Sequence, residues 1–244
     1  MKKYLIFIIV LAKGLLTYSQ IITNDVYEFP LKRGSKEWKQ FETIKERIDA
    51  LQIPNIVLSN ISTEGLLETC LSFPYLTDIF FSDNTQLGFV ALMNEFNGFQ
   101  EFFKRKDFTN ALLEKYRNLI VDIKSLQSNG SVNKGLFSFR HFVLEFMMAQ
   151  DDFIKKLDFE QDQKLISLSI EYKKIKQLNP DIYSNLNDLP TYLLYAKKMI
   201  NDSSFEIKNA DLKKDLQNFI KEPRFLNQSV IEYLENYINV KYKL

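Results

Sequence analysis

From about residue 35 onward, apolar residues recur every three or four positions, and no segment shows the sustained alternation of a strand. The clearest case begins after Ser35, a residue suited to cap a helix. Its apolar positions are separated by three, three, four and three residues, and they are Trp38, Phe41, Ile44, Ile48 and Leu51. This spacing predicts one helix from Ser35 to Leu51 with a buried stripe. We expect Trp38 to pack against the helix that begins near Ser62.

Cap and breaker residues delimit the other helices of the first half. Pro54 favours a short helix from Asn55 to Asn60, and Ser62 is expected to cap a helix that Pro74 ends. A short helix is predicted at 75–81. A longer one is predicted at 85–97, closed by Gly98 in the left-handed conformation. Asp107 is expected to cap a further helix that buries Leu112, Tyr116, Leu119, Ile123 and Leu126.

Residues 127–135 form the clearest polar interruption, because they hold two of the seven glycines and almost no apolar side chain. We interpret them as a linker between helical subdomains at 35–126 and 136–244. The second subdomain is predicted to contain helices at 136–156, 159–178, 189–201 (capped by Asp188), 209–221 and 228–241. The fold class expected is all-α, a multi-helix bundle or irregular α-solenoid of about ten helices.

Residues 1–19 have the organisation of a cleaved secretory signal peptide. Lys2 and Lys3 precede the apolar run Tyr4–Ala12, and small residues lie before a cut ahead of Gln20. The run is too short to span a bilayer, although a retained anchor remains the alternative. We therefore expect an exported protein, whether periplasmic, cell-surface or secreted. Its mature chain would have no transmembrane segment and would begin with an extended segment at 20–34.

Charge and cysteine content narrow the expected partners. Cleavage removes three lysines from 32 basic residues, which leaves 29 basic against 31 acidic residues and a net charge of −2. This balance argues against nucleic acid, which is bound through many Lys and Arg contacts to phosphate. Cys70 is the sole cysteine, so no internal disulfide can form. Its apolar helical context predicts a buried small hydrophobe.

The only histidine, His141, lies four positions before Glu145, so the two share a helix face and could supply two metal ligands. A zinc site needs three or four ligands, and neither a second histidine nor a cysteine pair can complete one. A Ser-His-Asp triad would also need His141, but no Gly-x-Ser-x-Gly elbow is present to position a serine. We therefore assign no metal, catalytic or cofactor-binding residue.

Two other patterns have simpler explanations. Gly130 and Gly135 bracket four residues as in a phosphate loop, but Lys134 comes before the second glycine rather than after it. Neighbouring acids could supply an acid and a base for hydrolysis. Acids near helix starts also stabilise the helix dipole, and this is the interpretation we favour for them. These acids are Asp151, Asp152, Glu160 and Asp162.

Several short segments together resemble a group of uncharacterised exported helical proteins from Bacteroidetes-type Gram-negative bacteria. They are Ser35-Lys-Glu-Trp38-Lys, Leu51-Gln-Ile-Pro54, the run Ser62–Leu71 before Pro74, Phe96-Asn-Gly98 and Arg105. The resemblance covers roughly residues 27–116, with weaker similarity up to Met199. It implies a bacterial origin, export and a helical fold. It implies no activity and no functional residue.

These observations favour a non-enzymatic binding or scaffolding module of the bacterial cell envelope. Helical arrays present extended surfaces without needing reactive groups. The expected partner is an envelope protein or a glycan, with no cofactor. Two alternatives remain open: a carboxylate-dependent hydrolase or lyase with its site in a helical cleft, and a sugar-binding protein with aromatic platforms.

Overall fold

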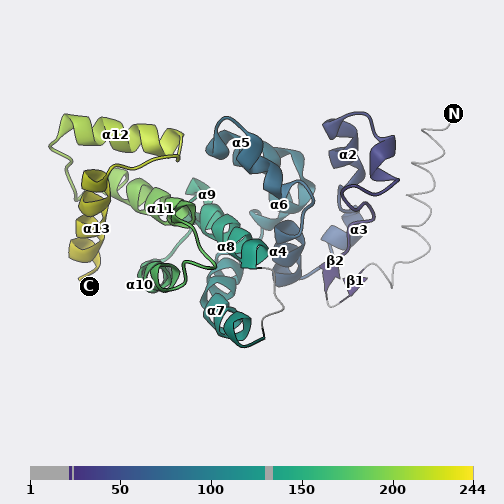
Figure 1. The fold of residues 1–244 in the computed structure, drawn as a ribbon, viewed down its shortest axis with the longest axis horizontal. Helices are drawn as coiled ribbons and strands as arrows, with labels where there is room; N and C mark the ends of the chain where they lie inside the picture. Colours follow the sequence, from purple (N-terminus) through teal and green to yellow (C-terminus); the bar gives the residue numbers. More distant parts are fainter. Residues whose placement is uncertain (1–21, 24, 130–133, 244) are drawn as a thin grey trace. The chain divides into compact units, whose positions relative to one another are not determined.

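The computed structural model describes residues 22–23, 25–129 and 134–243, and within these the fold is all-helical, as predicted. The described residues form twelve α-helices, α2 to α13, three short 3₁₀-helices and one two-stranded hairpin (Figure 1). The predicted signal peptide, residues 1–19, lies outside the described residues. The chain forms two compact units. The first contains the described residues up to Asp83 together with Leu87–Phe108, and the second contains Asn84–Gln86 and the chain from Thr109.

The first unit begins with a hairpin inside the segment predicted to be extended. Strands β1 (Ile22–Thr23) and β2 (Val26–Tyr27) pair antiparallel. Asp25 lies in the turn between the strands with a φ of 60°, and its Oδ1 accepts a hydrogen bond from the Ser62 amide at 3.2 Å. A Cβ atom at Gly65 would lie 1.8 Å from the Asp25 carbonyl oxygen. Glycine at this position therefore allows the hairpin to lie directly on helix α4.

The single helix predicted from Ser35 to Leu51 is wrong. A 3₁₀-helix at Trp38–Gln40 is followed by an extended residue, and α2 (Ile44–Ala50) then begins at a new cap. The Thr43 Oγ1 accepts from the Glu46 amide at 3.1 Å while the Glu46 carboxylate accepts from the Thr43 amide, which is a capping box. This local pairing starts a separate helix and turns Ile44 outward, where it is 59% exposed.

Trp38 is buried, as predicted, and it stacks on a residue that lies just beyond the predicted helix. Its side chain is 7% exposed and stacks on Tyr75, with ring centroids 5.1 Å apart. The Arg47 guanidinium lies 5.7 Å from the centre of the Trp38 ring and covers it further. Tyr75 follows the helix that Ser62 caps. The sequence thus predicted the burial of Trp38 but not the residue on which it packs.

The other helices of the first unit mostly begin at the predicted caps. Ser62 Oγ accepts from the Gly65 amide at 3.0 Å, which confirms the cap of α4. Asp107 precedes α7, and its carboxylate accepts a hydrogen bond from Thr63 Oγ1 at 2.8 Å. The elements of this unit are α3 (Asn55–Leu58), α4 (Thr63–Leu71), a 3₁₀-helix (Leu76–Phe81), α5 (Thr85–Glu95, whose first residues belong to the second unit) and α6 (Asn97–Phe102).

The predicted role of Gly98 is also wrong. Helix α5 ends at Glu95, and Gly98 lies inside α6 rather than closing a helix. The Asn97 side chain accepts from the Ile53 amide at 3.0 Å and donates to the Ile53 carbonyl at 2.8 Å, so it fixes the start of α6 against the chain before α3. A Cβ at Gly98 would lie 2.4 Å from the Phe96 ring. The glycine is there for packing, not for a left-handed turn.

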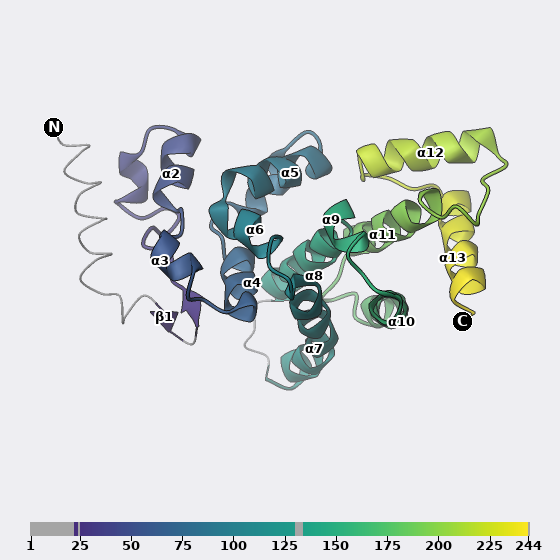
Figure 2. The same cartoon turned by 180° about the vertical axis from the view of Figure 1, so that it is seen from behind.

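The second unit is built around α11, which packs against α8, α12 and α13 (Figures 1 and 2). Residues Pro190–Lys197 of α11 are buried without interruption, as expected for a helix surrounded by others. The elements of this unit are α7 (Phe108–Asn129), α8 (Lys134–Met148), α9 (Asp151–Ile154), α10 (Phe159–Leu178), a 3₁₀-helix (Asn185–Asp188), α11 (Leu189–Ile200), α12 (Ala210–Lys221) and α13 (Gln228–Tyr242).

Three helix boundaries in this unit differ from the predicted ones. The linker predicted at 127–135 is helical at both of its ends, because α7 continues to Asn129 and α8 starts at Lys134; residues 130–133 lie outside the described residues. The predicted helix 136–156 divides after Met148, where Gln150 Nε2 donates to the Phe146 carbonyl at 2.7 Å. Asp188 does not cap α11 through its side chain, since it ends the preceding 3₁₀-helix.

None of the helices in the described part of the chain combines the length and the apolar character needed to cross a bilayer.

Candidate functional site

The pair His141 and Glu145, noted from its spacing, lies at the centre of a polar cluster inside the second unit. His141 is fully buried, Glu145 is 4% exposed and the Lys176 side chain is 3% exposed. The two residues of the pair come from α8, and Lys176 comes from α10. Tyr116 of α7 and Thr191 of α11 complete the cluster. Four helices therefore meet at one carboxylate.

Both oxygens of the Glu145 carboxylate are hydrogen-bonded. Oε1 accepts from the Tyr116 hydroxyl at 2.7 Å. Oε2 accepts from Lys176 Nζ at 2.5 Å and from Thr191 Oγ1 at 3.1 Å. The Lys176 ammonium also donates to the Asn187 carbonyl at 2.7 Å. Paired and hydrogen-bonded in this way, the two charges can remain in the interior.

The electrostatics favour a charged Glu145. Burial by itself raises the pKa of this carboxyl group, but the positive charge of Lys176 outweighs it and lowers the pKa to about 2. The same carboxylate acts in the opposite direction on Tyr116. Burial and then the Glu145 charge raise the pKa of the Tyr116 hydroxyl well above its ordinary value. Tyr116 therefore remains a hydrogen-bond donor at any ordinary pH.

His141 lies beside this ion pair in its neutral form. Its Nδ1 is 2.9 Å from the Tyr183 hydroxyl, and its Nε2 is 3.2 Å from Glu145 Oε1 without the alignment of a hydrogen bond. Burial lowers the pKa of His141, and the Glu145 charge opposes that shift only in part. Tyr116 and Tyr172 each meet the imidazole edge to face. The ring is held on all sides by protein groups.

This geometry gives the cluster a structural role. Its groups are buried, and each atom of Glu145 that could act as a base already accepts a hydrogen bond from protein. Among the described residues, no three His, Cys, Asp or Glu side chains converge in a way that could hold a metal ion. What the cluster does is join α7, α8, α10 and α11 at a defined register, because any shift would leave a charge unpaired.

The acids weighed as a catalytic pair are not brought together as one. Asp151 Oδ1 pairs with Lys197 Nζ of α11 at 3.0 Å. Asp162 pairs with Lys198 and accepts from the Tyr242 hydroxyl at 2.8 Å. Asp152 and Glu160 are exposed. Cys70 is fully buried, and burial raises the pKa of its thiol, which matches the predicted small hydrophobe.

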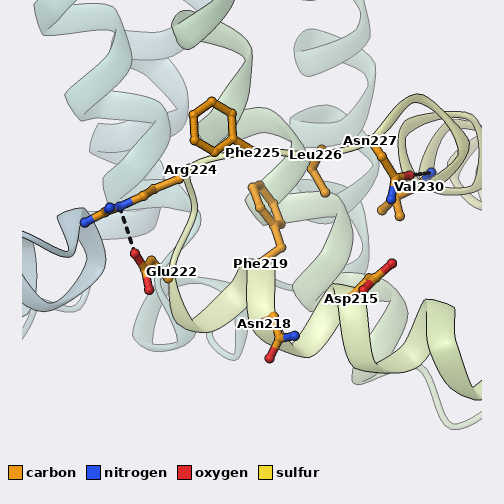
Figure 3. Close-up of a pocket in the computed structure, with 9 residues that line it drawn as sticks. All are labelled: Asp215, Asn218, Phe219, Glu222, Arg224, Phe225, Leu226, Asn227 and Val230. Atoms are coloured by element: carbon orange, nitrogen blue, oxygen red, sulfur yellow. Dashed lines mark hydrogen bonds and ion pairs between the residues drawn. The ribbon is translucent and has the colours of Figure 1, made fainter.

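An open groove lies where α12 turns into α13, also in the second unit (Figure 3). Its volume is about 460 Å³. The buried side chains of Phe219 and Val230 form its apolar base, and Phe225 stands at its mouth with 86% of its side chain exposed. The lining residues are Asp215, Asn218, Phe219, Glu222, Arg224, Phe225, Leu226, Asn227 and Val230.

Polar groups hold the shape of this groove. Arg224 Nε pairs with Glu222 Oε1 at 2.8 Å across the end of α12. Asn227 Oδ1 accepts from the Val230 amide at 2.9 Å and so caps α13. Sequence reasoning did not identify the groove. The available signal was a Phe-Leu pair after Pro223 in a connection that should be polar, between two amphipathic helices.

Comparison with known proteins assigns no family to the chain. No family model matches it, and no solved structure matches it. A 135-residue part of the chain, 54% of its length, is 27% identical to "Uncharacterized protein L144" of Acanthamoeba polyphaga mimivirus, of which it covers 52%. The chain thus spans about half the length of this relative. The resemblance to exported Bacteroidetes-type proteins stays a prediction.

Proposed function

We propose that this chain is a non-enzymatic binding or scaffolding module, and that it holds its partner in the groove between α12 and α13. The observation that supports this most directly is Phe225. A large aromatic side chain that is 86% exposed gains free energy when a partner covers it. Phe225 stands over an apolar base rather than on a flat surface, so a partner could bury it on two sides.

The contrast with the buried cluster supports binding over catalysis. The reactive groups of the second unit, Glu145, Lys176 and His141, are closed off from solvent and bonded to one another. A substrate in the groove would instead meet Phe219, Phe225 and Leu226, with amide and carboxylate groups at the rim. Such a lining can recognise a ligand by shape and polarity, and its two carboxylates are Asp215 and Glu222, of which Glu222 is paired with Arg224.

The setting that we propose is the bacterial cell envelope, with an envelope protein as the partner. This part of the proposal rests on the signal-peptide pattern of residues 1–19 and on the resemblance described above. It predicts that the mature protein begins at Gln20. Mass spectrometry of the protein isolated from cells that make it naturally would measure this end directly. An intact Met1 in the isolated protein would contradict export.

Site-specific cross-linking tests the binding role. A photoreactive phenylalanine analogue is placed at Phe225 and, as a matched control, at Phe159, an exposed phenylalanine of α10 in the same unit. We expect a discrete protein adduct from position 225 in intact cells and none from position 159. Equal labelling at both positions would contradict the groove. A saturable turnover of glycan, peptide or ester substrates by the purified protein would contradict the non-enzymatic role.

A further inference from the structure

The connection that borders the groove has main-chain groups without partners among the described residues. The Arg224 amide donates to the Glu222 carbonyl at 2.9 Å, and the next backbone bond begins at the Ile231 amide, which donates to the Asn227 carbonyl. Between them, Phe225 and Leu226 make no hydrogen bond to the described backbone. Asn227 is extended, with φ −76° and ψ 157°. Unpaired main-chain groups beside a groove can pair with the main chain of an extended peptide.

A second feature of the groove is the negative charge of Asp215 at its rim. Glu222 is neutralised by Arg224, whereas Asp215 has no ion pair with the described residues. The positions three and four residues from Asp215 on α12 are Asp211, Leu212, Asn218 and Phe219, and none of them is basic. Because helix neighbours at these spacings are the ones that could neutralise Asp215, its negative charge remains available to a ligand.

We infer that the groove binds an extended peptide segment carrying one large apolar side chain and, on the same side, a basic residue. Main-chain hydrogen bonds to Phe225 and Leu226 hold the peptide. The apolar side chain lies on Phe219 and Val230 beneath Phe225, and the basic side chain pairs with Asp215. In an extended chain, side chains two positions apart point the same way, so the basic residue lies two positions from the apolar one. This inference rests on the proposed binding function and names its ligand.

Fluorescence anisotropy with short labelled peptides tests this specificity. The probes contain Thr throughout, except for a central Leu and, two positions later, Lys, Ala or Glu. We expect the Lys peptide to bind best and the Glu peptide worst, with dissociation constants differing by about tenfold. Replacing the central Leu with Ser should weaken binding by about tenfold or more, because the apolar base of the groove is then left uncovered.

Matched variants assign each contact. Phe225→Ala should weaken binding of the Lys peptide by about tenfold, and the control Phe159→Ala should change it by less than about twofold. Asp215→Asn should bring the Lys, Ala and Glu peptides to within about twofold of one another, while the control Asp152→Asn should preserve their order. Thermal melts of all four variants check that each is folded, and all the replaced side chains are exposed.

Other outcomes would overturn the inference. Methylation of each peptide amide in turn removes one main-chain donor; if no position weakens binding, the main-chain pairing is wrong. If a glycan array binds instead and Phe225→Ala abolishes that binding, the occupant is a sugar and not a peptide. If no peptide binds at about 1 mM while position 225 still cross-links in cells, the peptide inference fails and the proposed function stands. If no peptide binds and position 225 does not cross-link in cells, the peptide inference and the proposed function are both wrong.

Discussion

In the first unit, Phe73 and Phe96 stack with their ring centroids 4.0 Å apart, whereas the interior of the second unit holds Glu145 and Lys176, whose charged atoms lie 2.5 Å apart. Different contributions to the free energy of folding stabilise the two interiors. The aromatic interior gains from area removed from water and from close packing. The ionic interior must first offset the desolvation of two charges and gains only if every group finds its partner.

This difference between the aromatic and the ionic interior predicts how the stability of each unit responds to substitutions. Truncating a side chain in the aromatic interior leaves a cavity whose cost depends on how far the neighbours relax. Removing one partner in the ionic interior leaves the other charge buried without that partner, and this loss is not recovered by side-chain repacking. The ionic interior also specifies the helix register more tightly, because Glu145 has donors on three other helices. Four predictions examine this comparison.

The largest effect is expected from Glu145→Gln. The substitution keeps the size of the side chain but removes the closest counter-charge of the buried Lys176 ammonium, which then has only the Asp188 carboxylate, 3.9 Å away. We expect the free energy of unfolding to fall by about 3–5 kcal/mol, measured by urea denaturation followed by circular dichroism. The double variant Glu145→Leu, Lys176→Met removes both charges and should recover a large part of that loss. A single variant within about 1 kcal/mol of the wild type would show that the pair is not buried as described.

Trp38→Ala probes the aromatic unit. We expect a loss of about 3 kcal/mol, at the lower end of the range for large aromatic residues because Trp38 is 7% exposed rather than fully buried. Trp38 is the only tryptophan, so its fluorescence reports on this site alone. The emission should be blue-shifted in the folded protein and move to longer wavelength on unfolding. Emission that is already red-shifted and readily quenched by iodide would contradict burial and favour the sugar-platform hypothesis.

The fold class and most helix starts could be predicted because their causes are local. Ser62 bonds its own first turn, and the α10 boundaries 159–178 follow from the apolar spacing and from Asp158, whose carboxylate accepts from the Gln161 amide at 2.8 Å. The break after Trp38–Gln40 also has a local cause, the Thr43–Glu46 capping box. It was missed because the apolar spacing continues across it and suggests a single helix.

The candidate sites were less predictable because their partners are distant in sequence. The spacing of His141 and Glu145 identified one helix face, but Lys176 is 31 residues beyond Glu145. A lysine on an amphipathic helix is normally expected at the surface, so the pattern gave no reason to place this one inside. The groove depends on how α12 and α13 are joined. Apolar periodicity does not predict the structure of the loop between two helices. Phe225 becomes a candidate binding residue only because it lines the same groove as Phe219 and Val230.

A smaller effect is expected where a methyl group is added. Gly98→Ala places a Cβ 2.4 Å from the Phe96 ring and 3.1 Å from Ile53 Cδ1, so the aromatic interior must shift. We expect a loss of about 1–3 kcal/mol in urea denaturation. The same substitution at the exposed helical Gly135 of α8 should instead stabilise slightly, by up to about 1 kcal/mol, because alanine favours helix. Equal effects at both positions would contradict the close packing around Gly98.

The smallest and most specific effect concerns pH. His141 is the only histidine, and burial lowers its pKa below the ordinary value of 6.5. The unfolded chain therefore binds a proton more readily than the folded chain does. The stability that neutral His141 contributes is complete above pH 6.5 and declines as the pH falls below that value. The lowered pKa of Glu145 adds a second loss in the same direction, between its ordinary 4.5 and about 2.

Urea denaturation at several pH values from about 7.5 to 5 measures the first of these losses. Burial raises the pKa of Asp188, and protonation of this group changes the stability of the wild type and of His141→Gln in the same way, so the difference between the two curves is assigned to His141. We expect the free energy of unfolding of the wild type to fall relative to that of His141→Gln over this interval, whatever their absolute values. Two parallel curves would show that His141 does not titrate differently in the folded state. The ionic interior would then differ from the aromatic one through Glu145 and Lys176 alone.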